Sequence, residues 1–337
     1  MGIKLLIDNG KHMLAPEVMD GVSVEWARTG LPGRLTFTAI ADKKLVINEG
    51  NVVKLWVNKK PFFKGYIFTR NQTDPDTVSI TCYDQLRYLK NQESYIFENI
   101  TADGIVHKIA DDFKLSYGKL ADTGYKFKSF TQDNVPLFDI IAEALEKTNT
   151  EQGKKYVLYD DFGKLTLEDG ANMDLNLLVD ESTAQSYSYS SSIDGETYNK
   201  VKIVKEGRAS GGGRVNEETE KKQRIRNRSV YIAQDENNMK RWGVLQLLEE
   251  INKDDNGQKT ANKKLKKHNA PEKTLGINGA FGDSRVRAGC RIGVVLKSTV
   301  DKATRKLIKL RVENVKHTFS GELHTMDLIL KGKGFDA

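Results

Sequence analysis

The first ninety residues alternate apolar and polar side chains with a period of two. Such alternation places one face of a β-strand in a core and the other face in water. Glycine and proline at residues 30–33 predict a turn between two of the alternating runs. The predicted strands are residues 22–26, 34–40, 52–57, 62–68 and 76–83. Several short strands at this spacing favour a β-sandwich or a β-barrel.

Two amphipathic helices and a hairpin are predicted in the next part of the chain. Apolar side chains share one helical face between residues 105 and 113, and Thr101 is placed to cap that helix. A second helix is predicted near Pro136, whose missing N–H costs nothing in a first turn. Residues 155–168 then form a hairpin. We therefore expect a small α/β module over residues 96–195.

Strand-like alternation returns in the last third of the chain. The predicted strands are residues 187–190, 197–205, 223–233, 273–277, 291–297, 306–319 and 323–331. Between them, apolar residues recur at helical spacing, namely Met239, Trp242, Leu245, Leu248 and Ile251. A lysine-rich helix follows, so a helical insert is predicted at about residues 235–270. The sequence thus indicates a mainly β protein with α+β insertions.

Composition is ordinary for a globular protein, with 337 residues, of which 38% are hydrophobic and 29% charged. The chain can bury the cores of two or three domains. No apolar run approaches the roughly 18 residues that a membrane helix requires. Its first residues do not resemble a secretory signal. Cys82 and Cys290 lie in alternating segments, so we expect free, buried thiols in a protein made in the cytoplasm.

The net charge of +7 is concentrated in two segments. Residues 202–228 contain nine basic and four acidic residues, and residues 259–273 contain six basic and one acidic. Segments of this kind bind nucleic acid or acidic proteins. No aromatic residue lies within 259–273, so base stacking is not indicated. We expect a solvated face or a protein contact, and no specific binding of nucleic acid.

The sequence contains no assembled catalytic, cofactor or metal site. The glycine-rich segment 207–214 lacks the Gly-Lys-Ser/Thr ending of a phosphate-binding loop. The five histidines, at 12, 107, 268, 317 and 324, lack zinc-site spacing. However, His317 and His324 can face each other across a predicted hairpin, and Cys290 can approach His317. Because Cys290 enters an apolar strand, an activated thiolate is not favoured. We expect no enzyme and no cofactor.

The order of motifs in the last third resembles a known family. Residues 270–279 form a strand, followed by R-A-G-x-x-I at 287–292, V-x-x-V-x-H-x-F at 312–319 and H-T-M-x-L-x-L at 324–330. This order is similar to that of the XkdQ/YqbQ-type tail proteins of defective prophages. Those proteins are related to the late control protein D family of baseplate hubs. The middle module and residues 240–246 resemble theirs too, so the resemblance covers most of the chain.

The resemblance implies a structural central hub subunit in the baseplate of a contractile phage tail or a tail-like bacteriocin. Residues 1–95 and 196–337 would be tail-tube-like β-barrels that flank the module, the second interrupted by the helical insert. His324, Thr325 and Met326 would pack inside or contact a neighbour. Three copies would form a pseudo-sixfold ring that joins the tail tube to the spike.

The implied partners are the tail tube protein, the spike protein, other baseplate proteins and the tape measure protein, in a particle assembled in the bacterial cytoplasm. No membrane contact is expected. An alternative function is that of a tail-associated cell-wall hydrolase, because tail proteins often carry such domains. Its candidate residues would be His317 and Cys290.

Overall fold

The computed structural model describes residues 2–41, 45–180, 182–205, 228–251, 256–295 and 307–332. The chain divides into two compact units. Unit 1 comprises Met1–Tyr189 and Thr274–Ala337, and unit 2 comprises Ser190–Lys273. No helix of the described residues is long and apolar enough to cross a membrane.

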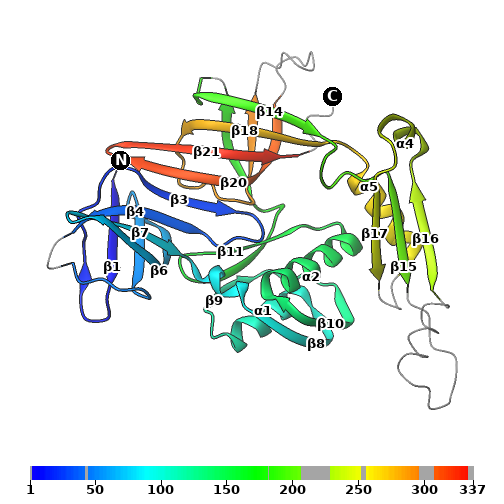
Figure 1. The fold of residues 1–337 in the computed structure, drawn as a ribbon, viewed down its shortest axis with the longest axis horizontal. Helices are drawn as coiled ribbons and strands as arrows, with labels where there is room; N and C mark the ends of the chain where they lie inside the picture. The colour runs from blue at the N-terminus through cyan, green and yellow to red at the C-terminus, as the bar shows by residue number, and fades with distance from the viewer. Residues whose placement is uncertain are drawn as a thin grey trace. The chain divides into compact units, whose positions relative to one another are not determined.

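Thirteen strands of the described residues form one large sheet (Figure 1). Along its main path they are β14 (Ser186–Ser192), β18 (Glu272–Phe281), β21 (Leu323–Lys331), β20 (Ile308–Ser320), β3 (Val22–Ala27), β4 (Arg34–Ile40), β7 (Thr77–Tyr83), β6 (Lys60–Asp74), β5 (Val52–Val57), β1 (Ile3–Asp8) and β2 (Met13–Leu14). Two further strands, β19 (Arg291–Val295) and β13 (Asp174–Asp180), branch from β20. The pairings among the described residues leave this sheet open rather than closed into barrels.

The antiparallel pair β20–β3 joins the first and last parts of the chain. Its register runs from Asn314 opposite Ala27 to Phe319 opposite Val22. Figure 1 shows β3 beside β20, with β21 on the other side of β20. Two β regions at the ends of the chain are expected from the sequence, and the structure confirms a mainly β fold. It adds that the two regions share one sheet through this pair, which we call the β20–β3 seam.

Each side of the seam has its own apolar core. The first core lies among β1, β3, β4, β5, β6 and β7 and includes Leu55 and Ile80. The second lies among β13, β18, β19, β20 and β21 and includes Ile277 and Met326. Trp26 packs against both cores. Burying each such aliphatic side chain contributes about 1.5–3 kcal/mol.

The α/β module contains both predicted helices. Its elements are η1 (Gln85–Lys90), β8 (Gln92–Thr101), α1 (Ala102–Asp112), β9 (Tyr117–Leu120), β10 (Lys126–Pro136), α2 (Leu137–Gln152), β11 (Tyr156–Asp160) and β12 (Leu165–Asp169). The Thr101 side chain accepts a hydrogen bond from the Gly104 N–H, as its predicted capping role requires. Apolar residues of α1 and α2 are buried in one core. The predicted hairpin is confirmed as the antiparallel pair β11–β12.

Unit 2 contains a three-stranded sheet with β15 (Lys200–Lys205) at its centre. β16 (Ser229–Gln234) pairs with β15 antiparallel, and β17 (Gln246–Ile251) pairs with it parallel. The helices are α4 (Glu236–Trp242) and α5 (Gly257–His268). The lysine-rich helix is therefore confirmed. Residues 207–214 lie outside the described residues.

The prediction that helical spacing continues through Ile251 is wrong. α4 ends at Trp242, and Gly243 follows with a φ of 77°, which a residue without a side chain adopts freely. The next residues form β17, which pairs with β15 along its whole length. A short apolar run fits a helix or a strand equally well, and here pairing with a neighbouring strand decides. The division of the chain at residues 95 and 195 stays a prediction.

Candidate functional site

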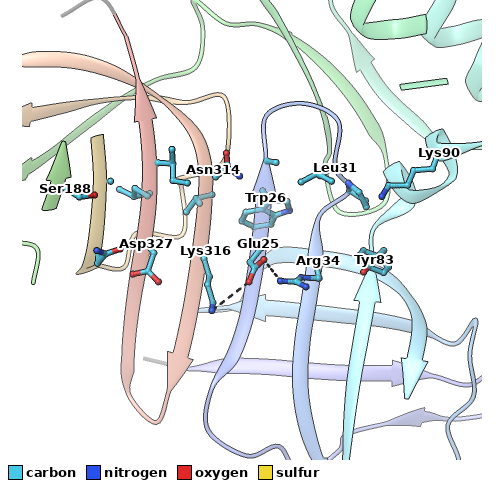
Figure 2. A pocket seen from close by; sticks show the side chains of 17 residues that line it. Glu25, Trp26, Leu31, Arg34, Tyr83, Lys90, Ser188, Asn314, Lys316 and Asp327 are labelled. Carbon is cyan, nitrogen blue, oxygen red and sulfur yellow. Dashed lines mark hydrogen bonds and ion pairs between the residues drawn. The ribbon is translucent and has the colours of Figure 1, made fainter. Parts of the chain in front are cut away.

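A groove of about 690 Å³ crosses the outer face of the large sheet at the β20–β3 seam. Side chains from β4, β3, β20, β21 and β18 line it, together with Lys90 and Ser188 (Figure 2). The groove is therefore built by both ends of the chain. Its lining mixes charged and polar side chains with apolar ones in about equal parts, whereas the pockets that bind most small ligands are mainly apolar.

Charges of alternating sign cross the groove from strand to strand. Arg34 is opposite Glu25, Glu25 is opposite Lys316, and Lys316 is opposite Asp327. Glu25 lies 2.6 Å from the Arg34 guanidinium and 3.8 Å from the Lys316 ammonium (Figure 2). Opposite charges in directly paired positions stabilise a sheet by about 0.2–1 kcal/mol each. We call these four residues the charge row.

A second row, next to the charge row, consists of hydroxyl side chains. Its members, in strand order, are Thr325, Thr318, Ser23, Thr36, Thr81 and Thr69. The hydroxyls of Ser23 and Thr36 are 2.7 Å apart, within hydrogen-bonding distance. The hydroxyl row and the charge row give the outer face a polar surface in which the charges balance.

Beneath the groove, His317 and His324 face each other, as the sequence predicted. His317 Nδ1 is 2.9 Å from His324 Nε2, and His317 Nε2 is 3.0 Å from the carbonyl oxygen of Val286. Since that carbonyl only accepts, His317 Nε2–H donates to it, and His324 Nε2–H then donates to His317 Nδ1. His324 Nδ1 is left as a buried acceptor with no partner among the described residues.

The histidine pair is packed among aromatic rings. The imidazole of His317 makes edge contacts with Trp26 and Phe62, and that of His324 stacks on Phe319 with ring centres 4.4 Å apart. Burial lowers the pKa of His317 to about 3 and that of His324 to about 4. Both rings are therefore neutral at pH 7. The pair belongs to the core, because both rings are buried among aromatic side chains.

Two buried carboxylates form a second unusual cluster. Asp84 accepts hydrogen bonds from the N–H groups of Gly33 and Leu86 at 2.9 and 3.1 Å. Asp160 accepts one from Gly163 at 2.6 Å, while its Oδ2 has no partner within the described part of the chain. Burial raises the pKa of both carboxyls, and the charge of Asp160 raises that of Asp84 further.

Arg287 connects this cluster to the rest of unit 1. Its guanidinium donates to the carbonyl oxygen of Asp160 at 2.9 Å. It also lies over the rings of Tyr159 and Trp26, 4.0 and 5.4 Å from their centres. The three regions of unit 1 therefore meet here, because Asp84 precedes η1, Asp160 ends β11 and Arg287 precedes β19. Charged groups with perturbed pKa values mark functional sites or structural ion networks, and these contacts favour a structural joint.

The other candidates from the sequence do not assemble into a catalytic site. Burial raises the pKa of the Cys82 and Cys290 thiols, which opposes thiolate formation. The one hydrogen bond that the structure describes from Cys290 Sγ goes to the carbonyl oxygen of Arg285, not to His317. The electrostatic interaction between Asp84 and Asp160 could not be predicted from the sequence, since nothing local relates two residues so far apart.

Comparisons with known proteins give relatives along nearly the whole chain. It is 29% identical over 321 residues to the uncharacterized protein YqbQ of Bacillus subtilis (strain 168), covering 92% of this chain and 91% of YqbQ. It is 28% identical, with the same coverage, to the phage-like element PBSX protein XkdQ of the same bacterium.

Solved structures show the same fold. The tail protein from Neisseria meningitidis MC58 matches with a TM-score of 0.68 at 10% identity, covering 99% of this chain and 98% of that one. The 43 kDa tail protein of prophage MuSo2 from Shewanella oneidensis matches with a TM-score of 0.64 at 12% identity, covering 97% and 98%. The fold is thus that of phage tail proteins. The sequence profile of the YqbQ-like family matches residues 22–331, and the chain belongs to this family.

Proposed function

We propose that the chain is a structural central hub subunit of a phage-tail baseplate, one copy in a ring that joins the tail tube to the spike. The observation that carries the proposal is the β20–β3 seam, which makes one continuous sheet from the two ends of the chain. The charge row and the hydroxyl row place balanced charges and hydroxyl groups on the outer face of this sheet, which suits the wall of a passage for other molecules. The particle would be a contractile phage tail or a tail-like bacteriocin.

The ends of the large sheet support assembly into a ring. β14 lies at one end of the main path and β2 at the other. β14 has the sequence Ser-Tyr-Ser-Tyr-Ser-Ser-Ser, with none of the charged residues that protect a free edge. Head-to-tail contacts between unlike edges close into a ring when the rotation between copies allows it. We infer a homotrimer, with two barrel-like β regions from each copy giving sixfold pseudosymmetry.

The relatives support a tail role, since one belongs to a phage-like element and two proteins of similar structure are tail proteins. The tail-tube-like role of the β regions in residues 1–95 and 196–337, whose large sheet is open within the described residues, belongs to this proposal, as do the module boundaries at 96 and 195. So do the partners, which are the tube, spike, tape measure and other baseplate proteins. The location would be the baseplate of a particle assembled in the bacterial cytoplasm.

Size-exclusion chromatography with light scattering tests the proposal. The chain is measured alone, then with the tube protein and with the spike protein of the same particle. We expect three times the mass of one chain, or a trimer that forms when a partner is added. A chain that stays monomeric and ignores both partners would contradict the proposed ring.

A further inference from the structure

Among the described residues, the three-stranded sheet of unit 2 is covered by a helix, α5, on one of its two faces. α5 places Ala261 in a core with Val201, Ile203 and Ala233, and Leu265 packs against the same core. In a β-strand, neighbouring residues point to opposite faces, so Lys200, Lys202 and Val204 lie on the other face of β15. We call this second surface the bare face.

Large aliphatic side chains are exposed on the bare face. Lys202 of β15 is opposite Ile232 of β16 and Leu248 of β17. The next residue of β16 on this face, Val230, is opposite Val204. Ile232, Leu248 and Val230 are 46%, 59% and 49% exposed. Exposed aliphatic residues gathered on one sheet face mark an interaction surface.

The positive charge of unit 2 indicates that a partner of this face would be acidic. Unit 2 contains 19 basic and 13 acidic residues, whereas unit 1 contains 34 and 33. Unit 2 therefore carries +6 of the net charge of +7. Lys200 and Lys202 bring part of this charge to the bare face itself, between the aliphatic residues of the outer strands.

We propose that the bare face docks an acidic amphipathic segment of another protein. The apolar side of that segment would cover Ile232, Leu248 and Val230, and its carboxylates would meet Lys200 and Lys202. A helix bound in this way would complete a layer opposite α5, which is how sheets with two apolar faces are normally covered. The proposal does not depend on the ring.

Two other occupants fit less well. A second copy of unit 2 would bring six positive charges against six, and like charges across an interface oppose binding. Nucleic acid would meet the positive charge, but single strands stack on aromatic rings, and the described bare-face positions of the three strands hold none. The aliphatic residues favour a protein segment.

Fluorescence anisotropy with the full chain tests the proposal. The probe is a labelled 18-residue helical peptide of leucine and glutamate in amphipathic order, and a second peptide has lysine in place of glutamate. We expect saturable binding of the glutamate peptide only, weakened by salt. Lys202→Glu and Ile232→Ser should each weaken it about tenfold or more, equivalent to about 1.4 kcal/mol.

Matched controls come from unit 1. Lys11→Glu makes the same change of charge at an exposed position, and Ile96→Ser removes an isoleucine that is 76% exposed. Both should leave binding within about twofold, below the 1.4 kcal/mol of a tenfold change. Circular dichroism checks each variant, and Leu248→Ser replaces Ile232→Ser if the latter unfolds.

Several outcomes would overturn the proposal. These are no saturable binding of the glutamate peptide, equal binding of the lysine peptide, or tighter binding of a 20-base-pair DNA that Lys202→Glu abolishes. A fourth is that Ile232→Ser lowers the mass of the particle in solution, which would show that the bare face binds a second copy of the chain. If the chain is a trimer that does not bind the peptide, the docking proposal is wrong and the proposed ring is unaffected. If the chain is a monomer that binds the peptide, the proposed ring is wrong and the docking proposal is unaffected.

Discussion

Nδ1 of His317 lies 2.9 Å from Nε2 of His324, and this contact ties the β20–β21 hairpin together directly under the β20–β3 seam. Both rings are almost fully buried, at 0% and 5% exposure. Val286 accepts the outer hydrogen bond of the pair, so the segment before β19 is held by the same contact. The conformation of the seam therefore depends on two neutral imidazoles.

Acid should destabilise the protein through this pair. Each histidine has a folded-state pKa near 3 or 4, below the value of about 6.5 in an unfolded chain. The unfolded state thus binds more protons between those values, and stability falls as the pH falls from about 6.5 to 4. The loss approaches about 1.4 kcal/mol per pH unit for each histidine.

Guanidinium unfolding at a series of pH values measures this effect. The free energy of unfolding is compared between the natural chain and the double variant His317→Gln, His324→Gln. The double variant is less stable at pH 7, and its disadvantage should shrink steadily toward pH 4. A difference that does not change with pH would show that the histidines do not titrate as described.

The buried carboxylates should change the stability in the opposite direction to the histidines, because they favour folding at low pH. A carboxyl whose pKa is raised by folding supplies stability below its unfolded pKa, and that stability is lost as the pH rises through the folded pKa. Asp160→Asn removes one charge beside Asp84. The variant should therefore gain stability relative to the natural chain as the pH rises from 5 to 9, measured by urea unfolding.

Asp84→Asn should behave differently from Asp160→Asn. Both carboxylate oxygens of Asp84 accept backbone N–H groups, from Gly33 and Leu86. An amide NH2 in place of one oxygen would face a donor, at a cost of about 1–3 kcal/mol. This cost offsets the gain at rising pH that comes from removing a carboxyl with a raised pKa. Equal behaviour of the two variants would contradict the separate roles of Asp84 and Asp160.

Local patterns predicted much of this fold because the physics there is local. Alternation identified β3, β4, β5, β6 and β7 around the first core but not β1, and Thr101 marked the start of α1 through its capping oxygen. The spacing of His317 and His324 around a turn was enough to place them face to face. Each of these features depends on neighbours within a few residues.

Long-range pairing could not be predicted in the same way. Nothing near Glu25 indicates that Lys316 will be its partner, since the register of the seam is set by two complete cores. The same applies to Asp84 and Asp160, which come together only when the module packs on the first core. β17 was mistaken for a helix because six residues cannot reveal a period.

Arg287 should matter more to stability than its close neighbour Arg285. Arg287→Ala removes a hydrogen bond to the Asp160 carbonyl and contacts with two aromatic rings, so we expect a loss of about 1–3 kcal/mol in thermal or chemical unfolding. The guanidinium of Arg285 is exposed and bonds only to Asp283 among the described contacts. Arg285→Ala should change stability by less than about 0.5 kcal/mol. Similar losses in both variants would argue against the joint.

Zymography on peptidoglycan addresses the hydrolase alternative. Because the raised pKa of Cys290 opposes a thiolate and His317 hydrogen-bonds elsewhere, we expect no clearing by the purified chain. Clearing that disappears in His317→Ala or Cys290→Ser would replace the structural role with an enzymatic one. Clearing that persists in both variants would point to a contaminant, which a mock purification identifies.

The charge row allows a test of the polar face itself. Glu25→Lys would place three positive side chains side by side, because Arg34 and Lys316 are its direct neighbours. Each like-charge pair costs about 0.2–1 kcal/mol, so we expect a loss of about 1 kcal/mol at low salt that shrinks at 0.5 M salt. Glu322→Lys makes the same change of charge in the exposed turn between β20 and β21 and should have little effect. If both variants lose stability equally, the change in net charge is responsible. The claim that paired charges across the seam stabilise the sheet would then be wrong.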